Sequence, residues 1–241
     1  CGGDLDVFTG KAVLEAGCGA GRFTEVMLKA GARVFASDIS TAVEANYANC
    51  CSYPDYFVCQ ADIMELPVKP EQFDIVVCIG VIQHTPSPEQ TMKVLCSHVR
   101  PGGMLLIDHY TLGYATTPVR RWLRSYLKDK PKEFSLSFVQ ALCRGLWPLH
   151  RLLFFTRNVP VLRMLRPRLL YWSPLVDYHD AYPELGRKLL SEWAVLDTHD
   201  TLTDFYKHLR SAMQISEHLK ACGMTDISTA YAGNGVEARA K

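Results

Sequence analysis

The sequence has no apolar run long enough to cross a membrane, and it has almost no net charge. Charged residues interrupt the longest apolar stretches well before ~18 residues, so we expect no transmembrane helix. Lys and Arg number 26 and Asp and Glu 25, a formal net charge of +1, which argues against a generic polyanion-binding protein. The first residues, Cys1-Gly2-Gly3-Asp4, lack an initiator Met and a signal-peptide pattern, so we interpret them as a fragment boundary.

Paired cysteines are also lacking. The chain has nine cysteines, an odd number, and no two of them have C-x-x-C spacing. This argues against a zinc ribbon or a disulfide framework, and it favours a reducing, cytoplasmic location. The composition is that of a globular protein, with 48% apolar and 21% charged residues over 241 positions. That length corresponds to one large domain, or to one domain with a long insertion.

Short apolar runs alternate with helical patterns over the first 110 residues. The runs indicate strands at 11–16, 33–37, 56–61, 73–79 and 104–108. Gly233-Asn234-Gly235 between strand-like segments at 226–232 and 236–240 predicts a hairpin, with Asn234 in its turn. Continuous apolar strands separated by helices are typical of a parallel sheet covered on both faces. We therefore predict an α/β fold with a doubly wound, mostly parallel seven-stranded sheet that ends in an antiparallel hairpin.

Four sites have the spacing of a capping box, in which a hydroxyl and a side chain three residues later cap the start of a helix. They pair Thr41 with Glu44, Ser87 with Gln90, Thr201 with Asp204 and Ser211 with Gln214. Each pair predicts that a helix begins there.

Charge is distributed unevenly along the chain. Between Gly113 and Leu170 there are twelve basic and two acidic residues, whereas the remainder has fourteen basic and twenty-three acidic residues. Helical patterns dominate this segment, and prolines punctuate them at Pro118, Pro131, Pro148, Pro160 and Pro167. We therefore predict a basic helical insertion at 113–194, after the fifth strand, and a core formed by 1–112 and 195–241.

Three interpretations of the insertion remain open. It is a lid whose arginines select an anionic acceptor, a peripheral contact with an anionic membrane through 113–170, or a solvated basic face over a helical core. Trp122 and Trp147 among basic helices fit the membrane interpretation. No nucleic-acid partner is expected, because no stacking aromatics line a strand face.

A glycine-rich turn follows the first strand, with Gly17, Gly19 and Gly21 in the order G-x-G-x-G. Such a turn lets the backbone approach a ligand, with N–H groups directed at acceptor atoms. The next two strands end in Asp38 and Asp62, which suit ribose hydroxyls and an adenine amino group. Ordinary turn and capping roles are the alternative for each of these residues.

These motifs resemble the class I S-adenosylmethionine-dependent methyltransferase family. VLEAGCGAGR, FASDIS, QADIMELP, FDIVVCIGVIQHTPSP and HVRPGG match its motifs over about 8–110, and the resemblance resumes at 211–241. It implies S-adenosyl-L-methionine as cofactor and a Rossmann-like fold. The cofactor-binding residues that it implies are Glu15, Gly17, Cys18, Gly19, Gly21, Arg22, Asp38, Ile39, Asp62, Ile63, Ile79 and Gly80.

Methyl transfer from a sulfonium is an in-line displacement, in which a general base helps when the acceptor is a hydroxyl or an acidic carbon. The candidates for a base are His84, which follows the fourth strand, and His199 in the segment LDTHDTLTDFY. Asp108 is a third candidate; it ends the fifth strand with His109 and Tyr110, and which of the three faces the acceptor stays open. Helix capping is the alternative for His84 and for much of that segment. A metal site from Asp197, His199 and Asp200 is conceivable, but we expect no metal.

The sequence therefore predicts a methyltransferase for a small-molecule acceptor, with the acceptor atom left open. One alternative is a non-catalytic cofactor-binding protein on the same fold, and another is a membrane-associated methyltransferase with a lipophilic acceptor. A dehydrogenase is disfavoured, because Arg22 stands where the dinucleotide fingerprint requires a third glycine.

Overall fold

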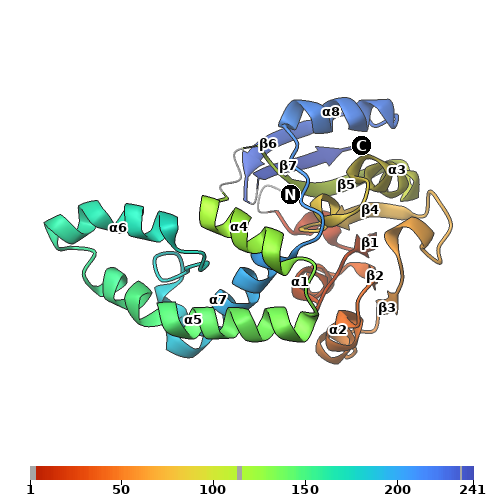
Figure 1. Cartoon of the computed structure of the whole chain (residues 1–241). Coiled ribbons are helices and arrows are strands. Elements are labelled where there is room, and N and C mark those ends of the chain that lie inside the picture. Colours follow the sequence, from red (N-terminus) through yellow and green to blue (C-terminus); the bar gives the residue numbers. More distant parts are fainter. Residues whose placement is uncertain (1–3, 113–115, 234) are drawn as a thin grey trace. The chain divides into compact units, whose positions relative to one another are not determined.

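The structure is a computed structural model that describes residues 4–112, 116–233 and 235–241 (Figure 1). It comprises two compact units. Unit 1 consists of residues 1–114 and 206–241, and unit 2 of residues 115–205. Gly113, the predicted start of the insertion, and Asn234 in the predicted turn lie outside the described residues. No helix of the described residues is long and apolar enough to span a membrane.

Unit 1 contains one seven-stranded sheet in the order β3-β2-β1-β4-β5-β7-β6. The strands are β1 Ala12–Ala16, β2 Arg33–Asp38, β3 Tyr56–Gln60, β4 Phe73–Cys78, β5 Val99–Tyr110, β6 Ser228–Ala232 and β7 Gly235–Ala240. The first five strands run parallel to one another, and β7 is antiparallel to both β5 and β6. The predicted fold class is thus confirmed, including the antiparallel pair at the end.

Helices cover both faces of this sheet, as continuous apolar strands require. They are α1 Arg22–Lys29, α2 Ala42–Cys50, α3 Pro88–His98 and α8 Ala212–Ala221. Leu105 and Ile107 of β5 pack with Leu95 of α3 and Leu219 of α8 on one face. Leu106, between them in sequence, packs on the other face with residues of α1 and α2, because successive strand residues point to opposite faces.

Local signals are confirmed at some element ends and wrong at others. Ser211 and Gln214 form the predicted capping box of α8, with both reciprocal hydrogen bonds present. The Thr41 and Ser87 side chains make no capping hydrogen bond, so these two predictions of a capping box are wrong, although α2 and α3 do begin there. Gly103 lies within β5, and the strand needs glycine there, because an added Cβ atom would lie 2.8 Å from the Asp74 carbonyl oxygen.

Unit 2 is helical, with α4 Pro118–Leu127, α5 Lys132–Phe155, α6 Pro160–Trp172 and α7 Gly186–Thr203. Its buried core joins α4, α5 and α7 through side chains such as Leu127, Val139 and Leu202. Pro148 and Pro167 lie inside α5 and α6 and do not end them. Around Pro148, buried Trp147 and Leu153 hold both halves of α5 in place.

The second boundary of the insertion differs from the predicted one. α7 runs without a break across residues 194 and 195, and Ala194 is fully buried in the unit 2 core, so this unit extends to residue 205. The predicted capping box at Thr201 is wrong for the same reason. Thr201 lies in the last turn of α7, and Asp204 is the C-cap of that helix.

Candidate cofactor and acceptor site

The carboxyl ends of β1 and β4 lie where the order of strands reverses direction. β1 lies between β2 and β4, and ligands of open α/β sheets bind at such a point. The chain leaves β1 through Gly17, Gly19 and Gly21, whose φ angles are 80°, 49° and 97°. Residues that have a Cβ atom rarely adopt such angles, so the turn depends on glycine at these positions. The predicted glycine loop therefore lies at the ligand-binding edge of the sheet.

The glycines at this site differ in how closely other atoms approach them. A Cβ atom added to Gly17 would lie 2.3 Å from Cγ2 of Val81, so Gly17 allows the segment after β4 to approach the loop. A Cβ atom on Gly19 or on Gly80 would meet no atom within 4 Å, although both residues have positive φ. Gly19 and Gly80 thus border open space, and their backbones are accessible to a ligand.

Asp38, the last residue of β2, is bonded to the glycine loop. Its Oδ2 accepts a hydrogen bond from the Gly19 amide at 2.8 Å. Its Oδ1 accepts from the amide and the hydroxyl of Ser40, at 2.9 and 2.7 Å. A carboxylate offers about four acceptor positions, so Asp38 can accept a further bond from a ligand hydroxyl.

A buried polar network supports the loop from beneath. The Thr24 hydroxyl donates to Oε2 of Glu15, and the Asn46 side-chain amide donates to Oγ1 of Thr24 at 3.0 Å and to the Gly19 carbonyl at 3.3 Å. The Tyr56 hydroxyl donates to Oδ1 of Asn46 at 2.6 Å. Sequence reasoning missed this network, which joins β1, α1, α2 and β3, although Asn46 on a predicted helix was an available signal.

Glu15 has a strongly shifted pKa in this network. Its side chain lies in β1 and is 3% exposed. Burial raises the pKa of Glu15 to about 7, with a smaller contribution in the same direction from the charge of Asp38, against the lowering effect of the Thr24 hydrogen bond. A cation bound near this carboxyl group would favour its charged form.

The residues predicted for the adenine side follow β2 and β3. Asp62 is exposed, and its Oδ1 accepts from the Met64 amide at 2.9 Å, so it caps a short 3-10 helix, Ile63–Glu65. Ile63 is 9% exposed, whereas Ile39 is 67% exposed after the end of β2. Asp62 thus has the helix-capping role that the sequence left as an alternative. The capping bond uses Oδ1 of Asp62 and does not involve Oδ2.

The other predicted cofactor residues lie around the loop. Cys18 is buried, and Arg22 is exposed with its guanidinium 5.3 Å from the centre of the Phe23 ring. Ile79 is half-buried and packs on the core below α1. These positions surround the same end of the sheet, and the cofactor assignments themselves stay predictions.

Asp108, a predicted general base, contacts the loop that follows β4. It is 5% exposed, and its Oδ1 accepts a hydrogen bond from the Gly80 amide at 2.6 Å. This contact gives Asp108 a role in positioning the Gly80 backbone. Its direct participation in catalysis stays a prediction.

His84, another predicted base, follows β4 in a 3-10 helix, Ile82–His84. Its Nδ1 lies 3.1 Å from the Tyr206 carbonyl oxygen, and its ring packs edge-on against Tyr110 with centroids 5.3 Å apart. A carbonyl oxygen can only accept, so the neutral ring carries its proton on Nδ1 and its lone pair on Nε2.

Next to His84 lie buried polar atoms without a partner among the described residues. They are both side-chain amide atoms of Gln83 and Nε2 of His109, and both residues are fully buried. The His208 amide donates to the Gln83 carbonyl at 3.0 Å, and burial, with the charges of Arg210 and His208, lowers the pKa of His109. Sequence reasoning missed Gln83, and unsatisfied buried groups of this kind call for an explanation.

His199, the third predicted base, lies on α7 in unit 2. Its Nε2 is 3.0 Å from Oγ of Ser135, and burial lowers its pKa. Nearby Asp197 accepts a hydrogen bond from the Tyr178 hydroxyl. Within the described residues no group of three or more His, Cys, Asp or Glu side chains could hold a metal ion. The structure thus shows internal contacts for His199 and Asp197.

Unit 2 contains a second polar network that sequence reasoning missed. Nδ1 of His150 lies 2.7 Å from Oδ2 of Asp177, and Nε2 lies 2.7 Å from Oγ of Ser173. His179 contacts the other Asp177 oxygen through its amide and Nδ1, at 2.9 and 2.5 Å. His150 is 1% and Ser173 7% exposed, so this network ties α5 to the segment after α6 inside the fold.

Comparison with known proteins agrees with this geometry. Residues 14–107 match the family model described as "Methyltransferase domain". Over this range the chain is similar to class I methyltransferase domains. The matched range includes the glycine loop, Asp38, Asp62 and the segment after β4, and the methyl donor of this class is S-adenosylmethionine.

Curated relatives of the methyltransferase domain are named "Ubiquinone biosynthesis O-methyltransferase". The one from Coxiella burnetii (strain Dugway 5J108-111) is 35% identical over 102 residues, which are 41% of this chain and 43% of the relative. The one from Stutzerimonas stutzeri (strain A1501) is 32% identical over 103 residues, which are 41% of this chain and 44% of the relative. The chain thus matches less than half the length of these relatives.

Two solved structures share the fold over nearly the whole chain. The CMeT domain of citrinin polyketide synthase has a TM-score of 0.54 at 14% identity and covers 97% of this chain and 46% of its own. The CurJ carbon methyltransferase has a TM-score of 0.52 at 17% identity and covers 96% of this chain and 48% of its own. At these identities the likeness concerns the fold alone.

Proposed function

We propose that this chain is an S-adenosylmethionine-dependent methyltransferase that transfers a methyl group in line to a small-molecule acceptor. The observation that carries the proposal is the glycine loop at the switch point of the sheet, with Asp38 bonded to the Gly19 amide at 2.8 Å. This arrangement joins exposed backbone, a carboxylate and open space at Gly19. The matched methyltransferase domain supports the same conclusion.

The residues of the site fit this cofactor. The Glu15 carboxyl group, with its pKa raised to about 7, suits the positively charged methionine end, and Asp38 suits the ribose. When bound, S-adenosylmethionine supplies a methyl group that is already activated for displacement. The chain then has to hold donor and acceptor in line and exclude water. The residues proposed to surround the donor are Glu15, Gly17, Cys18, Gly19, Gly21, Arg22, Asp38, Ile39, Asp62, Ile63, Ile79 and Gly80.

A hydroxyl is the acceptor group that the site supports best. The curated relatives are named O-methyltransferases, and His84, with its lone pair on Nε2, has the protonation pattern of a general base. Asp108 would act through the Gly80 backbone, as a positioning residue.

Cofactor binding can be measured by isothermal titration calorimetry with S-adenosylmethionine. Asp38→Asn keeps the shape of the side chain and removes its charge, so we expect the affinity to fall at least about tenfold. Asp55→Asn is the matched control, because Asp55 is exposed and lies before β3, outside the proposed site. Equal affinities for both variants and the original chain would contradict the proposed site.

Turnover can be measured as S-adenosylhomocysteine formed with a panel of phenols and amines. We expect His84→Gln to lower kcat at least about 100-fold for a phenol, because the variant lacks a group that can accept the proton of the acceptor. The affinity for the cofactor should stay unchanged. Cofactor binding without turnover on any acceptor would favour the alternative of a non-catalytic cofactor-binding protein.

The remaining proposals concern the role of unit 2 and the cellular location of the protein. Unit 2 would serve as a lid that selects an anionic or lipophilic acceptor, or as a peripheral membrane contact, and its basic composition is compatible with both. A catalytic role of His199, which lies in unit 2, stays a proposal. The eight cysteines of the described residues are free, which supports the proposal of a reducing cytoplasmic location.

A further inference from the structure

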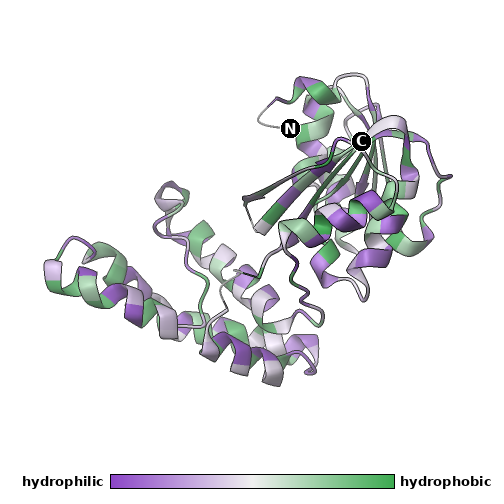
Figure 2. Ribbon diagram, turned by 90° about the horizontal axis from the view of Figure 1, so that it is seen from above, coloured by the Kyte–Doolittle hydropathy of each residue, from purple (hydrophilic) through white to green (hydrophobic). Residues whose placement is uncertain are grey.

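Helix α6 carries several large apolar side chains that are exposed in the described structure. None of its residues is buried, and none belongs to the core of unit 2 that α4, α5 and α7 share. Exposed fractions reach 62% for Val161, 65% for Met164 and 61% for Trp172. In Figure 2, green and purple segments alternate along this helix. Large exposed apolar surfaces of this kind mark interaction sites.

The sequence around α6 carries positive charge only. From Phe134 to Val176 there is no Asp or Glu. The basic residues of this stretch are all arginines, namely Arg144, Arg151, Arg157, Arg163, Arg166 and Arg168. An apolar helix within such a stretch is complementary to a surface that is both anionic and apolar.

The α6 residues divide into two arcs when they are placed at 3.6 residues per turn. One arc holds Arg163, Arg166 and Leu170, which follow each other at intervals of three and four. The other arc holds the exposed apolar side chains, with Arg168 among them. Its apolar members are Val161, Met164, Leu165, Leu169, Tyr171 and Trp172.

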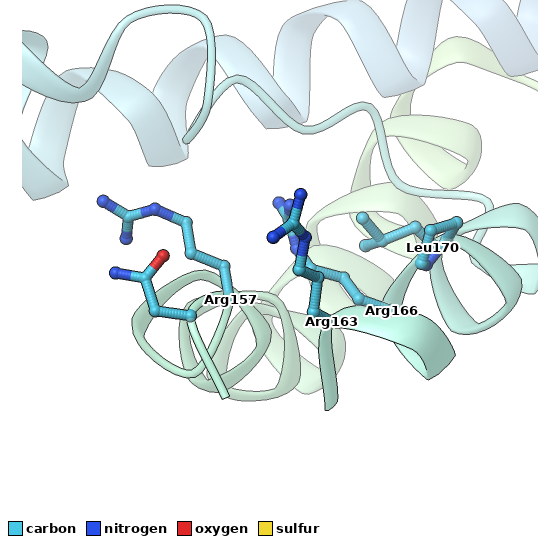
Figure 3. Close-up of a pocket in the computed structure, with 6 residues that line it drawn as sticks. Arg157, Arg163, Arg166 and Leu170 are labelled. Carbon is cyan, nitrogen blue, oxygen red and sulfur yellow. The ribbon is translucent and has the colours of Figure 1, made fainter. Parts of the chain in front are cut away.

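The arginine arc faces a hollow of about 490 Å³, which is also lined by Arg157. Figure 3 shows the guanidinium groups of Arg157, Arg163 and Arg166 at this hollow, with Leu170 at one end. Arg157 donates to the Phe154 carbonyl at 2.8 Å and lies over the Phe154 ring, and Arg166 pairs with Asp180. Among the described ion pairs, only Arg166 of these three arginines is paired with a carboxylate.

We propose that α6 and this hollow form a docking surface for an anionic phospholipid bilayer. The apolar arc would enter the interface of the bilayer, and the hollow beside it would take a lipid phosphate between Arg157 and Arg163. Arg168 would extend its charge to the head groups while its methylene groups stay with the apolar arc. A free phosphate would account for the arginines but not for the apolar arc, and the bilayer accounts for both. This inference does not depend on the proposed methyl transfer.

The test is sedimentation of the full chain with vesicles of phosphatidylcholine alone, or with phosphatidylglycerol added. We expect binding to the mixed vesicles only, and a decrease with salt. Arg163→Ala and Arg168→Ala should each lower the partition coefficient about fivefold, and the double variant about 25-fold. Arg121→Ala is the matched control, because Arg121 is an exposed arginine of α4 outside both arcs.

The apolar arc is tested separately by Met164→Gln. We expect it to lower the partition coefficient about tenfold, the effect of removing about two buried methylene groups. Far-UV circular dichroism and thermal unfolding should not change in any variant, since the mutated side chains are exposed.

Three results would overturn the proposal. The first is equal binding to neutral and anionic vesicles, and the second is unchanged binding by the Arg163 and Met164 variants. The third is binding of inorganic phosphate, measured by calorimetry and lost in Arg163→Ala, without binding of vesicles. Concentration-dependent association of the chain that Met164→Gln abolishes, without vesicle binding, would assign the surface to a second copy instead.

Discussion

The two units use polar side chains in different ways. In unit 1 they lie at strand ends and bind the backbone of loops, as Asp38 binds Gly19 and Asp108 binds Gly80. In unit 2 the principal polar network joins side chains to each other inside the fold, as His150 joins Asp177 and Ser173. Unit 1 also has a buried side-chain network, but that network lies under the glycine loop, where Asn46 bonds to the Gly19 carbonyl. The residues proposed to bind the cofactor all lie in unit 1.

The two units can be followed separately, because all four tryptophans lie in unit 2. They are Trp122, Trp147, Trp172 and Trp193. Tryptophan fluorescence therefore reports the unfolding of unit 2, and far-UV circular dichroism reports both units.

Gly17→Ala should have the largest effect on stability. A methyl group there would meet Val81 at 2.3 Å, and φ is +80°. The clash and the strained backbone together should lower the free energy of unfolding by about 4 kcal/mol and abolish cofactor binding. Urea unfolding followed by circular dichroism measures the loss. A stability close to that of the original chain would mean that the loop does not approach Val81 as described.

Glu15→Gln should change the pH dependence of stability in unit 1. In the folded chain the pKa of Glu15 is raised to about 7 from the ordinary value of 4.5. Between these two pH values the folded state keeps the Glu15 proton that the unfolded state loses, so the free energy of unfolding falls as pH rises through this range. The loss amounts to about 3 kcal/mol for the original chain and should be absent in the variant. Urea unfolding at pH 5 and pH 8 compares the two. Parallel pH profiles would contradict a buried, raised carboxyl group.

Asp177→Asn should remove a contribution to the stability of unit 2 that depends on pH in the opposite sense to that of Glu15. Despite burial, which raises it, the hydrogen bonds from His150 and His179 lower the pKa of Asp177 to about 2. Its stabilisation is therefore present above the unfolded value near 4 and is lost as pH falls toward 2. We expect a loss of about 2 kcal/mol at pH 7 in the variant, measured by tryptophan fluorescence in urea. No difference from the original chain at pH 7 would contradict the network.

Gly145→Ala is the counterpart of Gly17→Ala in unit 2. Gly145 lies inside α5, and a Cβ atom there would meet nothing within 4 Å. The variant should therefore gain about 1 kcal/mol, because alanine favours the helix. Fluorescence-detected unfolding shows the gain, and a loss of stability would indicate a close neighbour at this position.

The sequence was informative where a local pattern determines position. Each strand of the parallel sheet is an apolar run, and parallel strands bring their ends to one edge, so the positions of Gly17, Asp38 and Asp62 followed from order alone. The capping box at Ser211 was likewise local. Residues 14–107, which match the methyltransferase domain, contain both the apolar strand pattern and the residues at the strand ends.

The parts that sequence reasoning missed depend on tertiary packing. α7 continues past the predicted boundary because Ala194 and Leu202 are buried in the core of unit 2, which no local signal encodes. Pro148 lies within a helix that packing holds on both sides. The Thr24 and Asn46 contacts under the glycine loop required knowledge of which helices meet there.

A crystal structure of the chain grown with S-adenosylmethionine tests the central claim most directly. We expect density for the adenosyl group beside the Gly17–Gly21 backbone, with the ribose hydroxyls bound to Asp38 and the methionine ammonium near Glu15. Occupancy elsewhere on the chain, or a glycine loop closed by the protein's own side chains at saturating cofactor, would contradict the account.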